Sequence, residues 1–197
     1  MGKSVEFFFD VGSPAAYLAW TQLPRIAAES SATIVWRPML LGGVFKATGN
    51  VSPVTIAAKG RWLMADLARW AARYGVALKL PADFPVNTLL LMRGAVGMQR
   101  NDPQDLDRYL TAVFNGIFGR GLAMGDAAVV AQVLADAGFD AAQFQALTSE
   151  PAVKQALITN TDDAIARGVF GAPSMFVDEV MHFGQDRLEF VAAALRG

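Results

Sequence analysis

The start of the chain places a strand, a helix and a second strand in close succession, and this order limits the possible folds most strongly. Residues 5–9 form a short, β-favouring apolar run. Ser13 and Pro14 follow, and serine is a favoured helix N-cap and proline a favoured first helical residue. We therefore expect a helix from there to about residue 28, and β-branched residues indicate a strand at 32–37. Such a unit implies parallel strands joined by a right-handed crossover.

The end of the chain has the complementary pattern of two strands and a helix. Residues 174–177 and 180–183 have strand character, and a last amphipathic helix follows Gly184-Gln185-Asp186. Between the two ends, helical spacing of apolar residues occurs at 57–74, 87–98, 105–118, 126–137 and 152–167. We predict an α/β fold in which residues 1–44 and 166–197 form one domain and residues 45–165 form a large all-helical insertion.

Composition excludes several kinds of chemistry. The chain has no cysteine, which excludes a disulfide, a thiolate metal site and a dithiol redox couple. With His182 as the one histidine, we predict no metal site. A formal net charge of −1 gives no footprint for nucleic acid. The start lacks a signal-peptide pattern, and no apolar run reaches the ~18 residues of a membrane span. We expect a cytoplasmic protein without nucleic-acid or membrane partners.

Ser13 is the first candidate functional residue. A hydroxyl at a strand-to-helix junction lies where free backbone N–H groups and the positive end of the helix dipole converge. That location stabilises an anion, including a thiolate carried by a ligand. The alternative interpretation is an ordinary N-cap, and the Ser-Pro pair by itself does not separate the two.

Pro173 is the second candidate, because it lies between a glycine-bearing loop (residues 168–171) and a strand. A cis peptide before this proline would leave the N–H and C=O of Ala172 free to pair with an extended peptide. Cis bonds are uncommon, at about 5–6% of X-Pro bonds in folded proteins. The chain has the order strand-helix-strand, helices, Gly-x-Pro, strand-strand-helix. In this order, Ser13 and Pro173 together indicate a functional site more strongly than either does alone.

The ordered motifs resemble those of a known family along the whole chain. The matching stretches are Phe9-Asp10…Ser13-Pro14…Tyr17-Leu18, Gly49-Asn50, Lys59-Gly60-Arg61, Asp66-Leu67-x-Arg69-Trp70, Phe84-Pro85-x-Asn87-Thr88, Gly168-Val169-Phe170-Gly171-Ala172-Pro173 and Phe183-Gly184-x-Asp186-Arg187. They resemble the 2-hydroxychromene-2-carboxylate isomerases and kappa-class glutathione transferases, whose fold is thioredoxin-like, of the DsbA type. One departure is residues 54–58, Val-Thr-Ile-Ala-Ala, which lack the polar Asn-Arg pair of naphthalene-pathway isomerases.

The resemblance implies glutathione as cofactor and assigns roles to particular positions. Ser13 would donate a hydrogen bond to the glutathione sulfur and favour the thiolate. The remaining implied cofactor-binding residues are Ala172, Pro173, Gly184, Gln185, Asp186, Asn50 and Lys59. Lys46, Trp62 and Asn87 are the candidates to bind substrate, with Lys46, Lys59 and Asn50 holding its carboxylate or phenol oxygen. Considered without the family, Asn50 is typical of a turn, Lys59 of a solvated helix, and Asn87 and Asp186 of helix starts.

Three functions follow as alternatives. The first is a glutathione-dependent cis–trans isomerase of an unsaturated aromatic carboxylate, and the second a kappa-type transferase that conjugates glutathione to an electrophile. The third is a binding module without turnover. The family and the apolar fraction of 53% also suggest a homodimer. We interpret His182 as a strand residue near the pocket rim rather than as a catalytic base.

Overall fold

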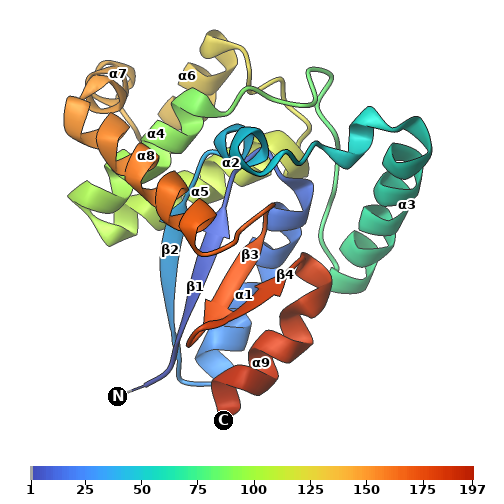
Figure 1. The fold of residues 1–197 in the computed structure, drawn as a ribbon. Helices are drawn as coiled ribbons and strands as arrows, with labels where there is room; N and C mark the ends of the chain where they lie inside the picture. The colour runs from blue at the N-terminus through green and yellow to red at the C-terminus, as the bar shows by residue number, and fades with distance from the viewer. Residues whose placement is uncertain (1) are drawn as a thin grey trace.

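The computed structural model describes residues 2–197, which form a mixed four-stranded sheet covered by helices on both faces (Figure 1). The first unit contains β1 (Ser4–Phe9), α1 (Pro14–Glu29) and β2 (Thr33–Pro38), and the last contains β3 (Ser174–Val177), β4 (Val180–Phe183) and α9 (Leu188–Arg196). Between them lie α2 (Leu41–Thr48), α3 (Ala57–Tyr74), α4 (Leu89–Asn101), α5 (Pro103–Phe114), α6 (Ala127–Asp136), α7 (Ala141–Ser149) and α8 (Pro151–Ala166).

The sheet has the order β2-β1-β3-β4 and contains both strand directions. β1 pairs in parallel with β2, and Ser4 lies opposite Thr33. β3 pairs antiparallel with both β1 and β4, so that Phe8 lies opposite Ser174. The predicted parallel first unit and the ββα ending are therefore confirmed. This is the thioredoxin-like arrangement that the resemblance implied.

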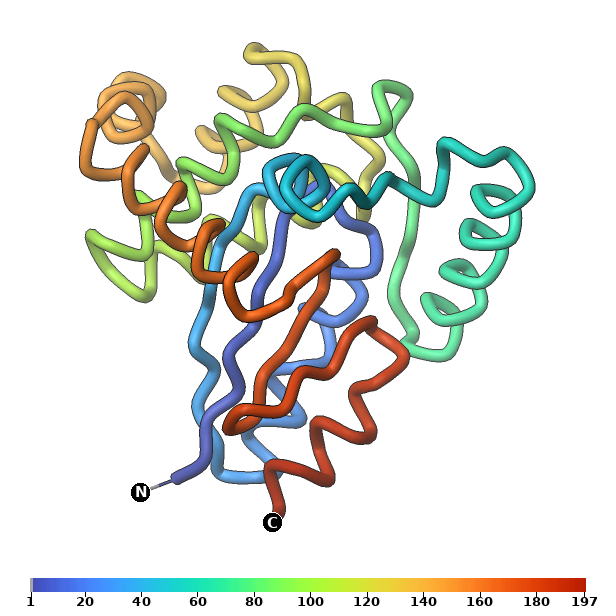
Figure 2. The backbone as a smooth tube through the Cα atoms, in the orientation of Figure 1, coloured from blue at the N-terminus to red at the C-terminus, as the bar shows by residue number. Residues whose placement is uncertain are grey.

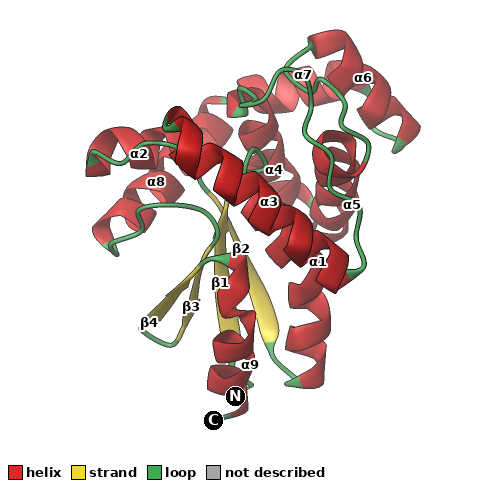
Figure 3. Ribbon diagram, turned by 90° about the vertical axis from the view of Figure 1, so that its right-hand side faces the viewer, coloured by secondary structure: helices red, strands yellow, loops and turns green. Residues whose placement is uncertain are grey.

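The central position of β1 explains its continuous apolar sequence, because both of its faces are covered. Phe7 and Phe9 are fully buried in the larger core, together with residues of α1 and α9. Phe8 points to the other face, where a second, smaller core contains Phe176 and Val44 of α2. Figure 3 shows α8 and α1 on opposite sides of the sheet. A strand buried on both faces loses the alternating pattern of a half-exposed one.

Half-buried charges cover the smaller core. The Arg167 guanidinium lies 4.0 Å from the ring centroid of Phe176 and bonds to Glu6 at 2.8 Å. Arg37 pairs with Asp163 on α8. These cation–π and ionic contacts add to the apolar packing of Ala164, which holds α8 against the sheet.

The middle of the chain is helical, as predicted, but has more helices than the sequence pattern indicated. The helix at Ala57–Tyr74 has its expected bounds and ends at Gly75, whose φ of 69° is the left-handed conformation that glycine tolerates. The helices α2 and α7 were not predicted. Figure 2 shows the middle of the chain passing beside and above the sheet. The larger core contains residues of α4 and α5 as well as β1 and α1, and the division into two domains stays a prediction.

Candidate active site

Ser13 caps the first helix directly after the central strand. Its Oγ accepts a hydrogen bond from the Ala16 N–H at 3.1 Å, and its backbone is extended (φ −92°, ψ 115°), as an N-cap requires. The side chain is buried to all but 5% of its surface. The Ala16 N–H bond polarises the hydroxyl and makes it a better donor. Ser13 is thus a hydrogen-bond donor held at the positive end of α1.

The acceptor of the Ser13 hydroxyl is the carbonyl of Ala172, at 3.0 Å. The Ala172–Pro173 peptide is cis, and the pairing of β1 with β3 places this loop beside the start of α1. Within residues 2–197, the Ala172 N–H donates no hydrogen bond, and Ala172 is partly exposed. The structure therefore leaves a free N–H next to the Ser13 hydroxyl. The Phe84–Pro85 peptide is also cis, which the sequence analysis did not anticipate.

Asp10 is a buried carboxylate that joins three segments around Ser13. Its two oxygens accept hydrogen bonds from the Gly12 N–H at 2.9 Å and the Leu41 N–H at 2.8 Å, and the Thr88 side chain also bonds to it. Burial raises the pKa of Asp10 above its usual 3.8, against the opposing effect of these hydrogen bonds. Asp10 fixes the start of α1, the start of α2 and the segment before α4 relative to one another.

The buried carboxylate gives a pH-dependent prediction. Because the pKa of Asp10 is raised in the folded chain, its contribution to stability is fully present below pH 3.8 and is lost as the pH rises through the folded-state pKa. In Asp10→Asn, one amide N–H faces a backbone N–H, so we expect a destabilised variant. The difference in free energy of unfolding should shrink with rising pH when urea midpoints are compared across a pH series. A difference that widens with pH would contradict the raised pKa.

A pocket of about 630 Å³ opens beside Ser13, within the ~300–1,000 Å³ typical of small-molecule sites. Its lining includes the following residues that the sequence analysis selected: Ser13, Asn50, Trp62, Ala172, Gly184, Gln185 and Asp186. These positions are far apart in the chain. The sheet topology brings them together, because the start of α1 and the loops before β3 and after β4 meet at one end of the sheet.

Other selected residues lie outside the pocket lining. Pro173 is buried behind Ala172. Lys46 on α2 and Lys59 on α3 are exposed. Asn87 is exposed, and its Oδ1 accepts from the Leu89 N–H at 3.2 Å, as at an ordinary helix start. His182 on β4 has a buried Nε2 without a partner in residues 2–197, and burial lowers its pKa.

Hydrogen bonds from two side chains, Asn50 and Tyr74, connect the segments around the pocket. The Asn50 Nδ2 donates to the Phe170 carbonyl at 2.8 Å, so Asn50 links the segment after α2 to the loop before Pro173. The Tyr74 hydroxyl donates to the carbonyl and side-chain oxygens of Gln185, at 2.9 and 3.1 Å. Burial raises the pKa of Tyr74 to about 12. These bonds fix α3 and the turn at Gly184 around the pocket.

The sequence analysis missed several lining residues. Asp10 and Thr88 belong to the matching motifs, but the sequence analysis assigned them no role. Both are buried and line the pocket. Gly12 marks the same contact, because a Cβ there would lie 2.8 Å from Thr88 Cγ2. Phe45, Phe170 and Phe183 also line the pocket, but a single aromatic residue in a helix, a loop or a strand end carries no periodic signal.

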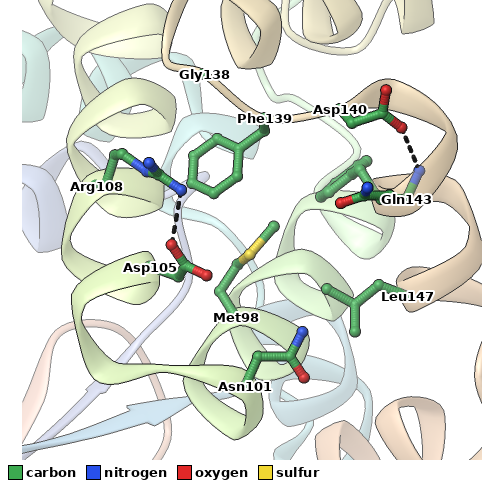
Figure 4. Close-up of a pocket in the computed structure, with 10 residues that line it drawn as sticks. Met98, Asn101, Asp105, Arg108, Gly138, Phe139, Asp140, Gln143 and Leu147 are labelled. Carbon is green, nitrogen blue, oxygen red and sulfur yellow. Dashed lines mark hydrogen bonds and ion pairs between the residues drawn. The ribbon is translucent and has the colours of Figure 1, made fainter.

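A second cavity of about 150 Å³ lies among the helices α4, α5 and α7 (Figure 4). Its charged groups have partners in the protein: Arg108 bonds to Asp105 at 2.7 Å, and Asp140 caps α7 by accepting from the Gln143 N–H. In residues 2–197 no group of three potential metal ligands occurs, and no helix is long and apolar enough to span a membrane. The pocket beside Ser13 is therefore the candidate active site.

A serine that caps the first helix and faces a cis-proline loop, on a sheet of this order, defines a protein of the thioredoxin-fold class. The model of the DSBA-like thioredoxin domain matches residues 4–196. Among curated relatives, a 2-hydroxychromene-2-carboxylate isomerase from Sphingobium xenophagum is 33% identical, with 99% of each chain covered. A glutathione S-transferase kappa 2 from Caenorhabditis elegans is 30% identical over 96% of this chain and 90% of the relative.

Solved structures agree with this class. A structure of 2-hydroxychromene-2-carboxylate isomerase superposes with a TM-score of 0.86 at 33% identity, covering 98% of this chain and 94% of that one. The chain therefore belongs to the family of 2-hydroxychromene-2-carboxylate isomerases and kappa-class glutathione transferases, within the DsbA-like thioredoxin-domain proteins.

Proposed function

We propose that this protein is a glutathione-dependent cis–trans isomerase that acts on conjugated aromatic compounds, and that Ser13 stabilises the thiolate of glutathione. The observation that carries the proposal is the Ser13 hydroxyl, polarised by the Ala16 N–H and 3.0 Å from the Ala172 carbonyl at the edge of a large pocket. Membership of a family of isomerases and glutathione transferases supports an enzyme. A cytoplasmic location and a homodimer stay predictions.

The residues around Ser13 fit the chemistry of glutathione. The free Ala172 N–H and the Ala172 carbonyl present one donor and one acceptor to the cysteinyl amide of an extended peptide. Gly184 precedes the helical turn Gln185–Arg187 on the same pocket, where backbone N–H groups suit a carboxylate and Asp186 suits an ammonium group. A γ-glutamyl group carries both of these charges.

Ser13 has one hydroxyl proton, so its two acceptors compete. Without a ligand the Ser13 hydroxyl donates its hydrogen bond to the Ala172 carbonyl. When a sulfur lies beside Ser13, the hydroxyl turns toward it and releases that carbonyl for the peptide N–H of the ligand. Peptide binding and donation to the sulfur are then linked through Ala172. The Ser13 oxygen remains held by the Ala16 N–H during this exchange.

The hydrogen bond from the Ser13 hydroxyl is strong enough to lower the thiol pKa of glutathione without an accompanying base. A free thiol has a pKa of about 8.5, and one pKa unit corresponds to about 1.4 kcal/mol. A charge-assisted hydrogen bond contributes roughly 1.5–3 kcal/mol. Bound glutathione supplies a thiolate that adds reversibly to a conjugated double bond and leaves again after rotation about the resulting single bond. The pocket walls, Trp62 among them, hold the aromatic part of the substrate.

The nearest competing function is transfer, in which glutathione is consumed. The family includes kappa-class transferases, and the same Ser13 would serve both reactions. Incubation with glutathione and either a chlorinated nitrobenzene or a cis-configured conjugated aromatic compound separates them. We expect isomerisation that needs glutathione and leaves the total thiol unchanged. Net loss of thiol would favour the transferase.

Calorimetry completes the test. We expect glutathione to bind with a dissociation constant in the range of about 10⁻⁵–10⁻³ M, within the working range of such cosubstrates. No heat of binding at millimolar glutathione would refute the proposal. Binding without turnover of any conjugated acid, ketone or electrophile would instead favour the binding module.

A further inference from the structure

Tyr74 lies at the end of α3, outside the pocket lining, and bonds to a residue inside that lining. Its hydroxyl donates to the Gln185 carbonyl at 2.9 Å, with the Gln185 Oε1 at 3.1 Å. Figure 1 shows the end of α3 beside the segment that joins β4 to α9. Gln185 is buried and lines the pocket. Tyr74 therefore connects the helical middle of the chain to the pocket without forming part of its surface.

The bond to the Gln185 carbonyl fixes the peptide unit that joins Gln185 to Asp186. This peptide is trans, and in a planar trans peptide the C=O and the N–H point in opposite directions. Because the carbonyl faces Tyr74, the Asp186 N–H points away from Tyr74. Within residues 2–197 this N–H donates no hydrogen bond. The bond to the carbonyl also polarises the N–H of the same peptide and makes it a better donor.

A second hydrogen bond fixes the other end of the turn at residues 184–187. The Gly184 N–H donates to the Pro173 carbonyl at 3.0 Å, and this bond joins the turn to the loop that contains Ala172. The two bonds together set the spacing between the Ala172 peptide and the Asp186 N–H. A ligand that must contact both groups binds more tightly when their spacing is fixed in advance.

We propose that Tyr74 is a positioning residue for glutathione: by fixing the Gln185–Asp186 peptide, its hydroxyl sets the affinity for the γ-glutamyl carboxylate. The inference rests on the proposed function, since it concerns how glutathione binds in the same pocket. Tyr74 lies outside the lining and so contacts neither the thiolate nor the second substrate. Burial raises the pKa of Tyr74 to about 12, so its hydroxyl remains a donor at every pH at which the thiolate forms.

Two tyrosine variants separate this role from the mere loss of a hydrogen bond. Tyr74→Phe removes the bond to Gln185. Tyr17→Phe is the matched control, because the Tyr17 hydroxyl donates to the Ala77 carbonyl at 2.9 Å, just beyond the same end of α3, and also lies outside the lining. We expect Tyr74→Phe to raise the dissociation constant of glutathione about three- to tenfold in calorimetry, and Tyr17→Phe to leave it unchanged. Equal weakening in both variants would overturn the inference.

A change in the ligand tests which part of glutathione depends on Tyr74. N-Acetylcysteinylglycine keeps the thiol, the cysteinyl amide and the glycine, but an acetyl group replaces the γ-glutamyl group. In competition calorimetry against glutathione, we expect Tyr74→Phe to bind this analogue as well as the wild type does. The preference for glutathione over the analogue should therefore fall about three- to tenfold in the variant. An equal loss of affinity for both thiols would mean that Tyr74 only supports the fold, and would overturn the inference.

Steady-state kinetics distinguish this role from that of Ser13. We expect Tyr74→Phe to raise the KM for glutathione about three- to tenfold and to keep kcat within about twofold of the wild type, because the Ser13 hydroxyl and its cap on α1 are unchanged. A fall in kcat at an unchanged KM would overturn the inference and leave the proposed function intact. Absence of glutathione binding in the wild type would refute the proposed function, and the inference with it.

Discussion

Replacing Ser13 by alanine should lower kcat/KM for the glutathione-dependent reaction by about 10- to 100-fold. The variant loses the hydrogen bond to the sulfur, worth roughly 1.5–3 kcal/mol for a charged acceptor, and a tenfold change in rate corresponds to about 1.4 kcal/mol. It retains the N-terminus of α1 and the free Ala172 N–H. We therefore expect the rate to fall more than the affinity for glutathione. Steady-state kinetics with varied glutathione and calorimetry measure the two effects separately.

The pH profile of the same variant gives an independent check. In the wild type, the Ser13 hydroxyl and the α1 dipole hold the thiol pKa of bound glutathione below its usual ~8.5. The rate should rise with pH and reach its plateau above this lowered pKa. In Ser13→Ala the plateau should move to higher pH by about one to two units, because the thiolate has lost its donor. An unshifted profile would mean that Ser13 acts only as a helix cap.

Two further substitutions separate the cap from the chemistry. Ser13→Thr keeps a hydroxyl and a favoured cap, and we expect it to restore much of the rate. Ser13→Gly lacks the hydroxyl but costs the helix only a few tenths of a kcal/mol, whereas alanine costs about 1 kcal/mol. Glycine and alanine should therefore share the loss of rate and differ in thermal stability. A rate that follows stability across the three variants would indicate a structural role.

The ends of the chain were predictable because their signals are local. The apolar run before Ser13, the Ser-Pro pair and the strand at 33–38 each follow from propensity and capping within a few residues. Their order fixed the parallel pairing of β1 with β2. The family motifs assigned Ser13, Ala172 and Asp186 to one binding site, and all three line the same pocket.

The remaining features depend on contacts between distant segments. The helix α2 contains Gly42 and Gly43, which have low helical propensity, and it forms where Val44 enters the smaller core. Whether Lys59 lies inside or outside the pocket lining depends on the orientation of α3, which helical spacing does not determine. In the sequence, Asp10 is an acidic residue that follows a strand, and nothing near it in the chain indicates that it is buried. Its burial follows from the positions of Leu41 and Thr88.

The largest expected effect on stability is at Gly94, where α4 crosses α5 and α7. A Cβ at this position would overlap the Tyr109 hydroxyl and lie 2.6 Å from Phe144 Cε2. Tyr109 is fully buried, and its hydroxyl donates to the Leu91 carbonyl at 2.8 Å. The substitution Gly94→Val must displace that ring or separate the helices, so overpacking adds to the loss of a buried hydrogen bond.

We expect Gly94→Val to lower the free energy of unfolding by about 3–5 kcal/mol, measured from urea midpoints at constant m-value. Gly42→Ala is the matched control, because a Cβ at Gly42 on α2 meets no atom within 4 Å. It replaces a helical glycine without crowding and should gain up to about 1 kcal/mol. If the change in free energy of unfolding has opposite signs in the two variants, the close approach of α4 to its neighbours, rather than helix propensity, determines the residue at position 94. A Gly94→Val protein as stable as the wild type would mean that α4 does not pack this closely on Tyr109.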